Sequence, residues 1–206
     1  MSETTLSSIP QDDQHTDYDQ FAGLYPALPT PFDGDGDVDH DRLAERASRL
    51  EAAGVDGVVP VGSTGESATL THDEHVDVVE TVVAAVDCPV IAGSGSNSTH
   101  EALSLSERSV EAGADALLLI SPYYNKPEMH GVRDHYTRVA DAVDVPCIVY
   151  NVPSRTGSNL EPETVAALAE HPNIGGYKAA SGDAAQISEV IERTRTESFD
   201  VLSGDD

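Results

Sequence analysis

Basic residues are scarce in this sequence of 206 residues. Eleven lysines and arginines stand against 37 aspartates and glutamates, and the formal net charge is −26. A field of this sign repels nucleic acid and anionic membranes, so neither is an expected partner. An acidic surface is usually just a solvated one, but this excess is extreme. Together with an aromatic content of 5%, it predicts a salt-adapted cytoplasmic protein in which high ionic strength screens the self-repulsion.

Lysine, cysteine and long apolar runs are also scarce. Lys126 and Lys178 are the two lysines, and Cys88 and Cys147 each lie beside a proline at the start of an apolar run. Such cysteines are typical of buried small side chains, and no cluster of histidine and cysteine has metal-ligand spacing. Gly93-Ser-Gly95 lacks the third glycine of a dinucleotide-binding fingerprint. No run approaches the roughly 18 apolar residues of a membrane helix. We therefore expect no metal, no cofactor and no membrane span.

The chain divides into a short polar segment and one long domain. Residues 1–20 are polar and acidic, without the basic start or the apolar stretch of a signal peptide. This composition predicts a disordered acidic N-terminal extension. The remaining residues, 21–206, are enough for one domain with a single core.

From residue 24 onward, short apolar runs alternate with longer amphipathic segments. Seven runs have the composition of buried parallel strands bounded by Gly, Pro or Ser: 24–29, 57–61, 89–92, 116–120, 147–150, 174–178 and 199–202. Helical spacing separates them, over 39–53, from 71 onward, and over 99–113, 129–142, 161–170 and 183–194. The second of these segments begins with Thr71-His-Asp-Glu74, which fits a capping box.

This alternation predicts an α/β fold built from successive βα units without a reversal. Such units favour a closed (β/α)8 TIM barrel with every helix outside, over an open doubly wound sheet. A barrel needs eight strands, and this sequence stops just after the seventh predicted one. We expect an incomplete barrel over 21–206 that lacks its C-terminal part, either because the sequence is a fragment or because something else covers the open edge.

Polar residues gather after the predicted strands. Residues 62–66 follow the second strand, 121–126 the fourth and 150–157 the fifth, whereas the opposite strand ends are plain turns. In barrels of this kind the active site lies at the carboxyl ends of the strands. The asymmetry therefore predicts an enzyme.

Lys178 is the most informative residue. It lies in the strand-like segment Ile174-Gly-Gly-Tyr-Lys-Ala-Ala180 among small neighbours, in a chain that avoids lysine. Desolvation there would lower its pKa and free the amine to attack a carbonyl. The alternative is a strand-end lysine paired with a carboxylate. Lys126 precedes a proline in a predicted loop and is expected to lie on the surface.

Carbonyl chemistry on an amine also needs proton transfer and a clamp for the substrate. Tyr150 would relay protons at the mouth of the barrel, and Thr64 would hydrogen-bond it. Ser63, Thr64 and Gly65 would present hydroxyl and N–H groups to a carboxylate. Arg155 would hold a second carboxylate by a bidentate contact, or else form a surface salt bridge.

In this order and spacing, the motifs resemble those of the dihydrodipicolinate synthase / N-acetylneuraminate lyase family of pyruvate-dependent class I aldolases. The resemblance rests on residues 62–67, 123–125 and 150–153 and on the Lys178 strand, and it covers nearly everything after about Phe21. It implies a (β/α)8 barrel in which Lys178 forms a Schiff base with pyruvate.

The resemblance also assigns roles to other residues. It implies that Tyr150 is the central acid–base group, and that Thr64 and Tyr124 complete a hydroxyl relay. Tyr124 would be donated across a tight dimer interface, so a homo-oligomer, either a dimer or a tetramer, is implied. Ser63, Gly65 and Gly204, which follows the seventh strand, would contact the substrate.

Arg155 discriminates within the family. Pro153-Ser-Arg-Thr-Gly157 is similar to the pattern of the synthases, in which this arginine grips the carboxylate of aspartate semialdehyde. The implied reaction condenses pyruvate with L-aspartate 4-semialdehyde, on the lysine and diaminopimelate pathway. The alternative is a lyase that releases pyruvate from N-acetylneuraminate or a 2-keto-3-deoxy sugar acid. An inactive fragment is an alternative of another class. Ser63, where the synthases usually have Thr, and Ala179, where many have Glu, depart from the synthase pattern.

The resemblance extends to a regulatory site. In the lysine-inhibited synthases, free lysine binds at the dimer interface, and Glu101 here would suit its ammonium groups. The alternative is that His72 and His75 are first-turn helix residues without a ligand. The residues that match the regulatory site are Ser67, Ala68, His72, His75, Asn97, Glu101 and Tyr123.

Overall fold

The computed structural model describes residues 20–204. The predicted extension over residues 1–20 therefore lies outside the described residues, apart from Gln20. The last two residues of the predicted barrel domain are outside them as well.

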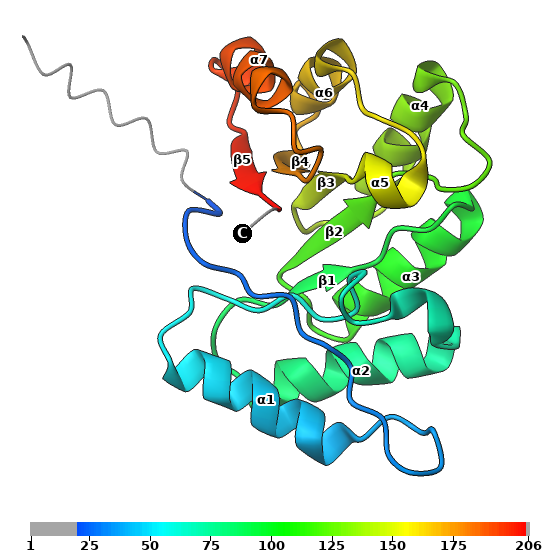
Figure 1. Ribbon diagram of the computed structural model, residues 1–206, viewed down its shortest axis with the longest axis vertical. Helices are drawn as coiled ribbons and strands as arrows, with labels where there is room; N and C mark the ends of the chain where they lie inside the picture. The colour runs from blue at the N-terminus through cyan, green and yellow to red at the C-terminus, as the bar shows by residue number, and fades with distance from the viewer. Residues whose placement is uncertain (1–19, 205–206) are drawn as a thin grey trace, which may run out of the picture.

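A parallel sheet forms the centre of the molecule (Figure 1). Its strands are β1 (Ile91–Gly93), β2 (Ala116–Ile120), β3 (Cys147–Asn151), β4 (Ile174–Ala179) and β5 (Asp200–Ser203), and they lie in chain order. Every neighbouring pair is parallel. The predicted α/β class and the predicted order of the last five strands are confirmed.

The first two predicted strands are irregular but occupy the predicted places. Segments 24–29 and 57–61 pair in parallel with each other through a single bridge. A second single bridge joins 57–61 to the residue before β1. Pro26, Pro29 and Pro60 interrupt them. Because proline lacks an N–H donor, it shortens the ladder that a strand can form. Seven parallel segments therefore follow one another in chain order.

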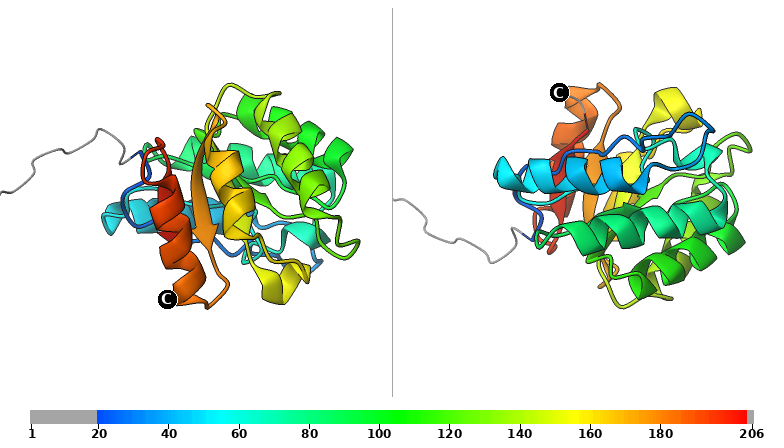
Figure 2. Two further views of the ribbon diagram at one scale, coloured as in Figure 1. Left: turned by 90° about the horizontal axis from the view of Figure 1, so that it is seen from above. Right: turned by 90° about the horizontal axis from the view of Figure 1, so that it is seen from below.

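Helices lie outside the sheet, as predicted for a barrel (Figures 1 and 2). They are α1 (His40–Ala52), α2 (His72–Ala85), α3 (Thr99–Glu111), α4 (Met129–Ala140), α6 (Pro162–Ala169) and α7 (Ala184–Thr194). Their bounds agree with the predicted ones to within one or two residues. Two short elements, η1 (Ser67–Thr69) and α5 (Pro153–Thr156), were not predicted, because three or four residues are too few to show a helical period. In the described part of the chain, no helix has the length and apolarity to cross a membrane.

The predicted capping box at the start of α2 is present. Thr71 Oγ1 accepts from the N–H of Glu74 at 3.2 Å, and Glu74 Oε2 accepts from the N–H of Thr71 at 2.8 Å. Such reciprocal capping satisfies two N–H groups that the helix leaves unpaired, and a cap of this kind stabilises a helix by about 1 kcal/mol.

Alternating strand residues divide the core into two layers. Leu117 and Leu119 of β2 belong to the larger cluster between the sheet and the helices. Leu118, Ile148 and Tyr150 belong to a smaller cluster on the opposite, inner face. Because side chains of a strand alternate between faces, every second residue of β3 and β4 points into the interior of the barrel. This alternation decides which side chains reach the site.

The two ends of the described chain meet beside β5. The N–H of Phe21 donates to Asp200 Oδ2 at 2.8 Å, although the residues are 179 positions apart. Phe21 is buried in the inner cluster. The first segment therefore lies next to the start of β5, and the parallel segments curve around a common interior.

Two histidines are buried in the fold without a full set of hydrogen bonds. His135 of α4 shares a 2.9 Å hydrogen bond between Nδ1 and Thr99 Oγ1, and His75 of α2 is equally buried. The Nε2 atoms of both lack a partner among the described residues. Burial lowers the pKa of each imidazole from 6.5 to about 4. Both side chains are therefore neutral near pH 7.

This burial predicts a loss of stability in mild acid. The unfolded chain takes up protons below pH 6.5, whereas folded His75 and His135 take them up only near pH 4. The stabilisation is complete above pH 6.5 and is lost as the pH falls toward 4, by about 2 kcal/mol per histidine between pH 7 and pH 5. Urea unfolding of His135→Gln should show a smaller drop between these pH values than the parent chain. His130→Gln, at an exposed position, is the control. Equal drops in all three proteins would contradict the assignment.

Candidate active site

A cavity of about 740 Å³ lies inside the curve of the parallel segments and includes residues at their carboxyl ends. Its wall is apolar inside the barrel, where Val59, Ile91, Leu118 and Ile148 line it. Polar residues that follow the strands surround its mouth. Six residues predicted to act on the substrate line this one cavity: Ser63, Thr64, Tyr150, Arg155, Lys178 and Gly204.

Lys178 and Tyr150 lie side by side on neighbouring strands. They are paired residues in the parallel register of β3 and β4. Lys178 Nζ is 4.9 Å from the centroid of the Tyr150 ring. Tyr150 is buried and Lys178 is half-buried, so the amine lies at the boundary between the apolar wall and the open mouth. An amine over an aromatic face, partly removed from water, is held in a defined position.

Gly204 packs directly against the stem of this lysine. A Cβ atom at position 204 would lie 3.1 Å from Lys178 Cε and 2.9 Å from the Cβ of Ala180. The N–H of Gly204 donates to the carbonyl of Ala179 at 2.6 Å. The chain after β5 therefore closes one side of the lysine, and any larger side chain at position 204 would displace its neighbours.

The loop after the second parallel segment carries Ser63 and Thr64. Val61 has a φ of 49° and Glu66 a φ of 56°, both in the left-handed region that non-glycine residues rarely adopt. Val61 is β-branched and buried, so its backbone is strained. These two turns fold the loop back over the cavity, which brings the half-buried Ser63 and the exposed Thr64 to its rim.

Gly65 lies inside the turn of this loop and away from the cavity. Its N–H donates to the carbonyl of Gly62 at 3.0 Å, and its carbonyl accepts from Thr30 Oγ1 at 2.7 Å. It is buried and does not line the cavity. The tight turn uses the N–H of Gly65, and the predicted contact of Gly65 with a substrate stays a prediction. The buried hydroxyl of Thr30 fixes the loop, a role that was not predicted from the sequence. The one sequence signal for this role is the position of Thr30 after the first predicted strand.

Arg155 reaches the cavity from a short helix that the sequence analysis missed. Helix α5 begins at Pro153, whose fixed φ suits a first helical position, and ends at Gly157 with a φ of 70°. Arg155 lies on this helix with an exposed side chain, so its guanidinium is available to a ligand at the mouth.

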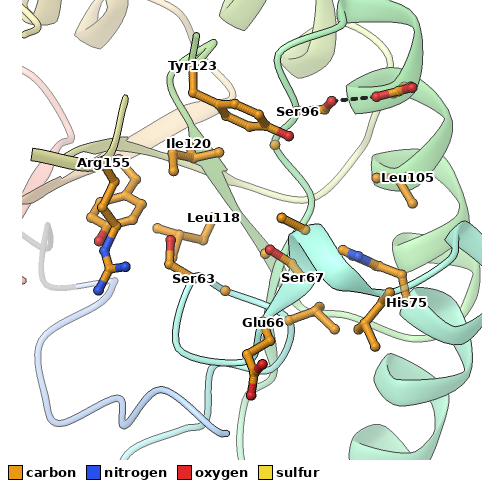
Figure 3. Close-up of a pocket in the computed structure, with 18 of the residues that line it drawn as sticks. Ser63, Glu66, Ser67, His75, Ser96, Leu105, Leu118, Ile120, Tyr123 and Arg155 are labelled. Carbon is orange, nitrogen blue, oxygen red and sulfur yellow. Dashed lines mark hydrogen bonds between the residues drawn. The ribbon is translucent and has the colours of Figure 1, made fainter. Parts of the chain in front are cut away.

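A second cavity, of about 390 Å³, adjoins the first. Ser63, Leu118, Tyr150 and Arg155 line both. Figure 3 shows Ser67 and His75 on one side of the second cavity and Tyr123 on another. Six of the seven residues predicted for the regulatory site line it: Ser67, Ala68, His72, His75, Glu101 and Tyr123. Asn97 does not, and lies half-buried before α3.

Two polar groups in the second cavity are notable. His75 is neutral near pH 7, because burial lowers its pKa to about 4, and its Nε2 lacks a partner among residues 20–204. Glu101 Oε2 accepts from Ser96 Oγ at 2.7 Å (Figure 3). The lining of this cavity thus includes a carboxylate and a neutral imidazole.

Tyr124 lies away from both cavities. It is 85% exposed and has a φ of 71°. An exposed aromatic ring on a left-handed backbone is unusual, and such strain clusters at functional positions. Tyr124 lines neither cavity of its own chain.

Known proteins are similar to this chain in sequence and fold. The model of the dihydrodipicolinate synthetase family matches residues 20–206. The 4-hydroxy-tetrahydrodipicolinate synthase of Haloarcula marismortui is 72% identical over 90% of this chain and 61% of its own length, which fits the salt-adapted composition predicted above. A crystal structure of the enzyme from Acinetobacter baumannii complexed with pyruvate is 42% identical, with a TM-score of 0.86, over 89% of this chain and 63% of the other.

A third similar protein is the enzyme from Cyanidioschyzon merolae, solved with lysine bound. It is 41% identical to this chain, with a TM-score of 0.84, over 88% of this chain and 63% of the other. The chain thus spans less than two thirds of the length of the relatives named here. The match of the family model to nearly the whole chain shows that the protein belongs to the dihydrodipicolinate synthetase family.

Proposed function

We propose that the whole protein is a 4-hydroxy-tetrahydrodipicolinate synthase, which condenses pyruvate with L-aspartate 4-semialdehyde through a Schiff base on Lys178. The observation that carries this proposal is the position of Lys178 Nζ, 4.9 Å from the centre of the Tyr150 ring, in a cavity at the strand ends. The similarity to synthases of this name supports the choice of reaction.

The chemistry requires an uncharged amine beside a proton relay. The neutral amine of Lys178 adds to the C2 carbonyl of pyruvate, and loss of water gives an iminium ion. Loss of a C3 proton then gives an enamine, whose carbon adds to the aldehyde of the second substrate. Apolar residues line the cavity that holds this amine, and removal from water favours the uncharged form that attacks a carbonyl. Tyr150, in contact with the amine, would move the protons.

The two hydroxyl groups of the loop have different surroundings. Ser63 borders both cavities together with Tyr150, whereas Thr64 borders only the larger one. This geometry favours Ser63 over Thr64 as the relay partner of Tyr150, and Thr64 as a contact for the carboxylate of pyruvate. Arg155, at the mouth, would hold the carboxylate of the semialdehyde by a charged, bidentate contact.

We further propose that the protein works as a homo-oligomer in the cytoplasm. The exposure and strained backbone of Tyr124 suit a side chain that a second copy receives next to its own Tyr150. The free Cys88 and Cys147 suit a reducing compartment.

The scarcity of lysine makes the central prediction easy to test. Borohydride reduction of the whole protein with pyruvate should add one reduced pyruvyl group, and peptide mapping should place it on Lys178. Lys126→Arg, at an exposed position, should be modified like the parent protein. Lys178→Arg should not be modified and should lose condensation activity by at least 1,000-fold, because the guanidinium stays protonated.

The outcomes of this experiment are distinct. Modification of Lys178→Arg, or an adduct that maps to Lys126, would contradict the assignment of the Schiff base. If the parent protein stays unmodified after borohydride reduction with pyruvate, the proposed Schiff-base chemistry is contradicted as a whole.

Arg155 should determine how tightly the protein binds the second substrate, aspartate semialdehyde. Arg155→Ala removes a charged hydrogen bond worth about 1.5 to 3 kcal/mol, so the KM for aspartate semialdehyde should rise by roughly tenfold to 100-fold. Trapping of pyruvate on Lys178 should change little, because pyruvate binds deeper in the cavity. Cleavage of N-acetylneuraminate or a 2-keto-3-deoxy sugar acid in place of condensation would show that the protein is instead a lyase.

A regulatory role for the second cavity is supported by a separate observation. His75, whose buried Nε2 lacks a partner among residues 20–204, lines the same cavity as Glu101. A small amino acid with two ammonium groups, such as free lysine, would complement these groups. We propose that lysine binds there and inhibits the protein.

Lysine binding should depend on Glu101. Loss of one charge-assisted contact in Glu101→Gln should weaken lysine binding about tenfold or more, as measured by calorimetry on the whole protein. Glu107→Gln changes an exposed carboxylate on the same helix and serves as the control. The regulatory proposal fails if millimolar lysine neither binds nor lowers the activity of the parent protein.

A further inference from the structure

Asn151 is a buried polar residue with every side-chain group occupied. Its Nδ2 donates to Asn159 Oδ1 at 2.8 Å and to the hydroxyl oxygen of Tyr177 at 2.9 Å. Its Oδ1 accepts from the N–H of Leu160 at 3.1 Å. Asn151 and Tyr177 are both inaccessible to solvent. Neither residue has a role predicted from the sequence.

The hydrogen-bond partners fix the orientation of this amide. The backbone N–H of Leu160 can only donate, so the oxygen of Asn151 must face it. Both N–H groups then point to acceptors, and the Tyr177 oxygen accepts one of them. Burial raises the pKa of Tyr177, which keeps its phenol neutral. The polar groups of the buried Asn151 amide all have partners, so another orientation of this amide would leave a polar group unpaired.

The network lies directly behind the candidate active site. Asn151 follows Tyr150 on β3, and Tyr177 precedes Lys178 on β4. Because neighbouring residues on a strand face opposite sides, Tyr150 and Lys178 face the cavity while Asn151 and Tyr177 face the helices. The same two strands are thus joined by a buried hydrogen bond on one face and carry the reactive pair on the other.

We propose that the Asn151–Tyr177 hydrogen bond is a positioning contact, which holds Tyr150 and Lys178 at the separation and angle that the Schiff-base chemistry needs. The inference rests on the proposed function, since it concerns the alignment of the same two side chains. Neither residue touches the cavity, so each acts through its neighbour on the strand.

The local register supports a need for such a contact. The pairing of β3 with β4 shifts at Cys147 and Ile148, where a bulge interrupts the regular ladder. The pairs beyond the bulge include Tyr150 with Lys178. The Asn151–Tyr177 hydrogen bond adds a side-chain contact between the two strands beyond the irregularity, next to the reactive pair.

The same amide also ties the loop of Arg155 to the strands. Asn159 and Leu160, both bonded to Asn151, end the loop that begins after Asn151 and contains α5. One buried side chain therefore sets the reactive pair and anchors the segment that carries the proposed carboxylate clamp. Its loss should impair both steps, whereas loss of the Tyr177 hydroxyl alone should impair mainly the first.

Tyr177→Phe is the sharpest test, because it removes one oxygen and keeps the packing. In the whole protein, the rate of pyruvate trapping by borohydride at saturating pyruvate should fall about tenfold, since small misplacements of reacting groups cost one to two orders of magnitude. The midpoint of its pH profile should move to higher pH, as the amine gains contact with water. Asn151→Ala should show both effects and a raised KM for aspartate semialdehyde.

Asn173→Ala is the matched control. Asn173 also donates two hydrogen bonds, to the carbonyls of Ala140 and Val143, but at the opposite end of β4. It should lower stability while leaving the trapping rate and the pH profile unchanged. In the double variant of Asn151→Ala and Tyr177→Phe, the trapping rate should equal that of Asn151→Ala alone, because the hydroxyl acts through the amide.

The outcomes separate this inference from the proposed function. If the parent protein forms no adduct on Lys178, the proposed function fails. If the parent protein reacts and Tyr177→Phe keeps its rate and pH profile, the positioning role is overturned and the contact is merely structural. The same conclusion follows if Asn173→Ala slows trapping as much as Asn151→Ala does, because a general loss of stability would then explain both.

Discussion

The side-by-side placement of Lys178 and Tyr150 on paired parallel strands is the constraint on which the site depends. An amine becomes a nucleophile at neutral pH only where its charged form is disfavoured and a proton acceptor is within reach. The parallel register supplies the neighbour, and the alternation of strand residues turns both side chains toward the apolar interior. Gly204 then closes the space beside the lysine stem. The rest of the barrel serves to hold these few atoms in place.

Backbone strain is concentrated at the same end of the barrel. Among residues 20–204, the non-glycine residues with positive φ are Val61, Glu66, Tyr124 and Lys126. All four lie in the loops after the second and fourth parallel segments. Strain of this kind costs stability and persists only where the surrounding structure enforces it. The opposite strand ends are tied by ordinary contacts, such as that of Asp200 with Phe21. The backbone is thus strained in the loops that border the candidate site and regular at the opposite strand ends.

Much of this architecture could be predicted from the sequence, because its signals are local. Apolar runs bounded by glycine and proline located the strands, and the capping box located α2. Lys178 stood out because lysine is rare and its neighbours are small. The parallel order then followed from the length of the βα units, and the structure brings the predicted polar strand ends to one cavity.

The features that were missed depend on contacts between distant segments. The use of the Gly65 N–H within its own turn, and the hydroxyl of Thr30 that fixes this turn, are visible only in three dimensions. The Asn151–Tyr177 bond joins residues 26 positions apart and has no periodic signature. Helix α5 is too short to show a helical period.

A crystal structure of the whole protein after borohydride reduction with pyruvate would test the central claim most directly. We expect electron density that runs from Lys178 Nζ into a pyruvyl group inside the barrel. The carboxylate of that group should lie against Ser63 or Thr64, and the hydroxyl of Tyr150 should lie beside the new bond. An unmodified Lys178 in a cavity without bound pyruvyl density, or a carboxylate that points away from this loop, would contradict it.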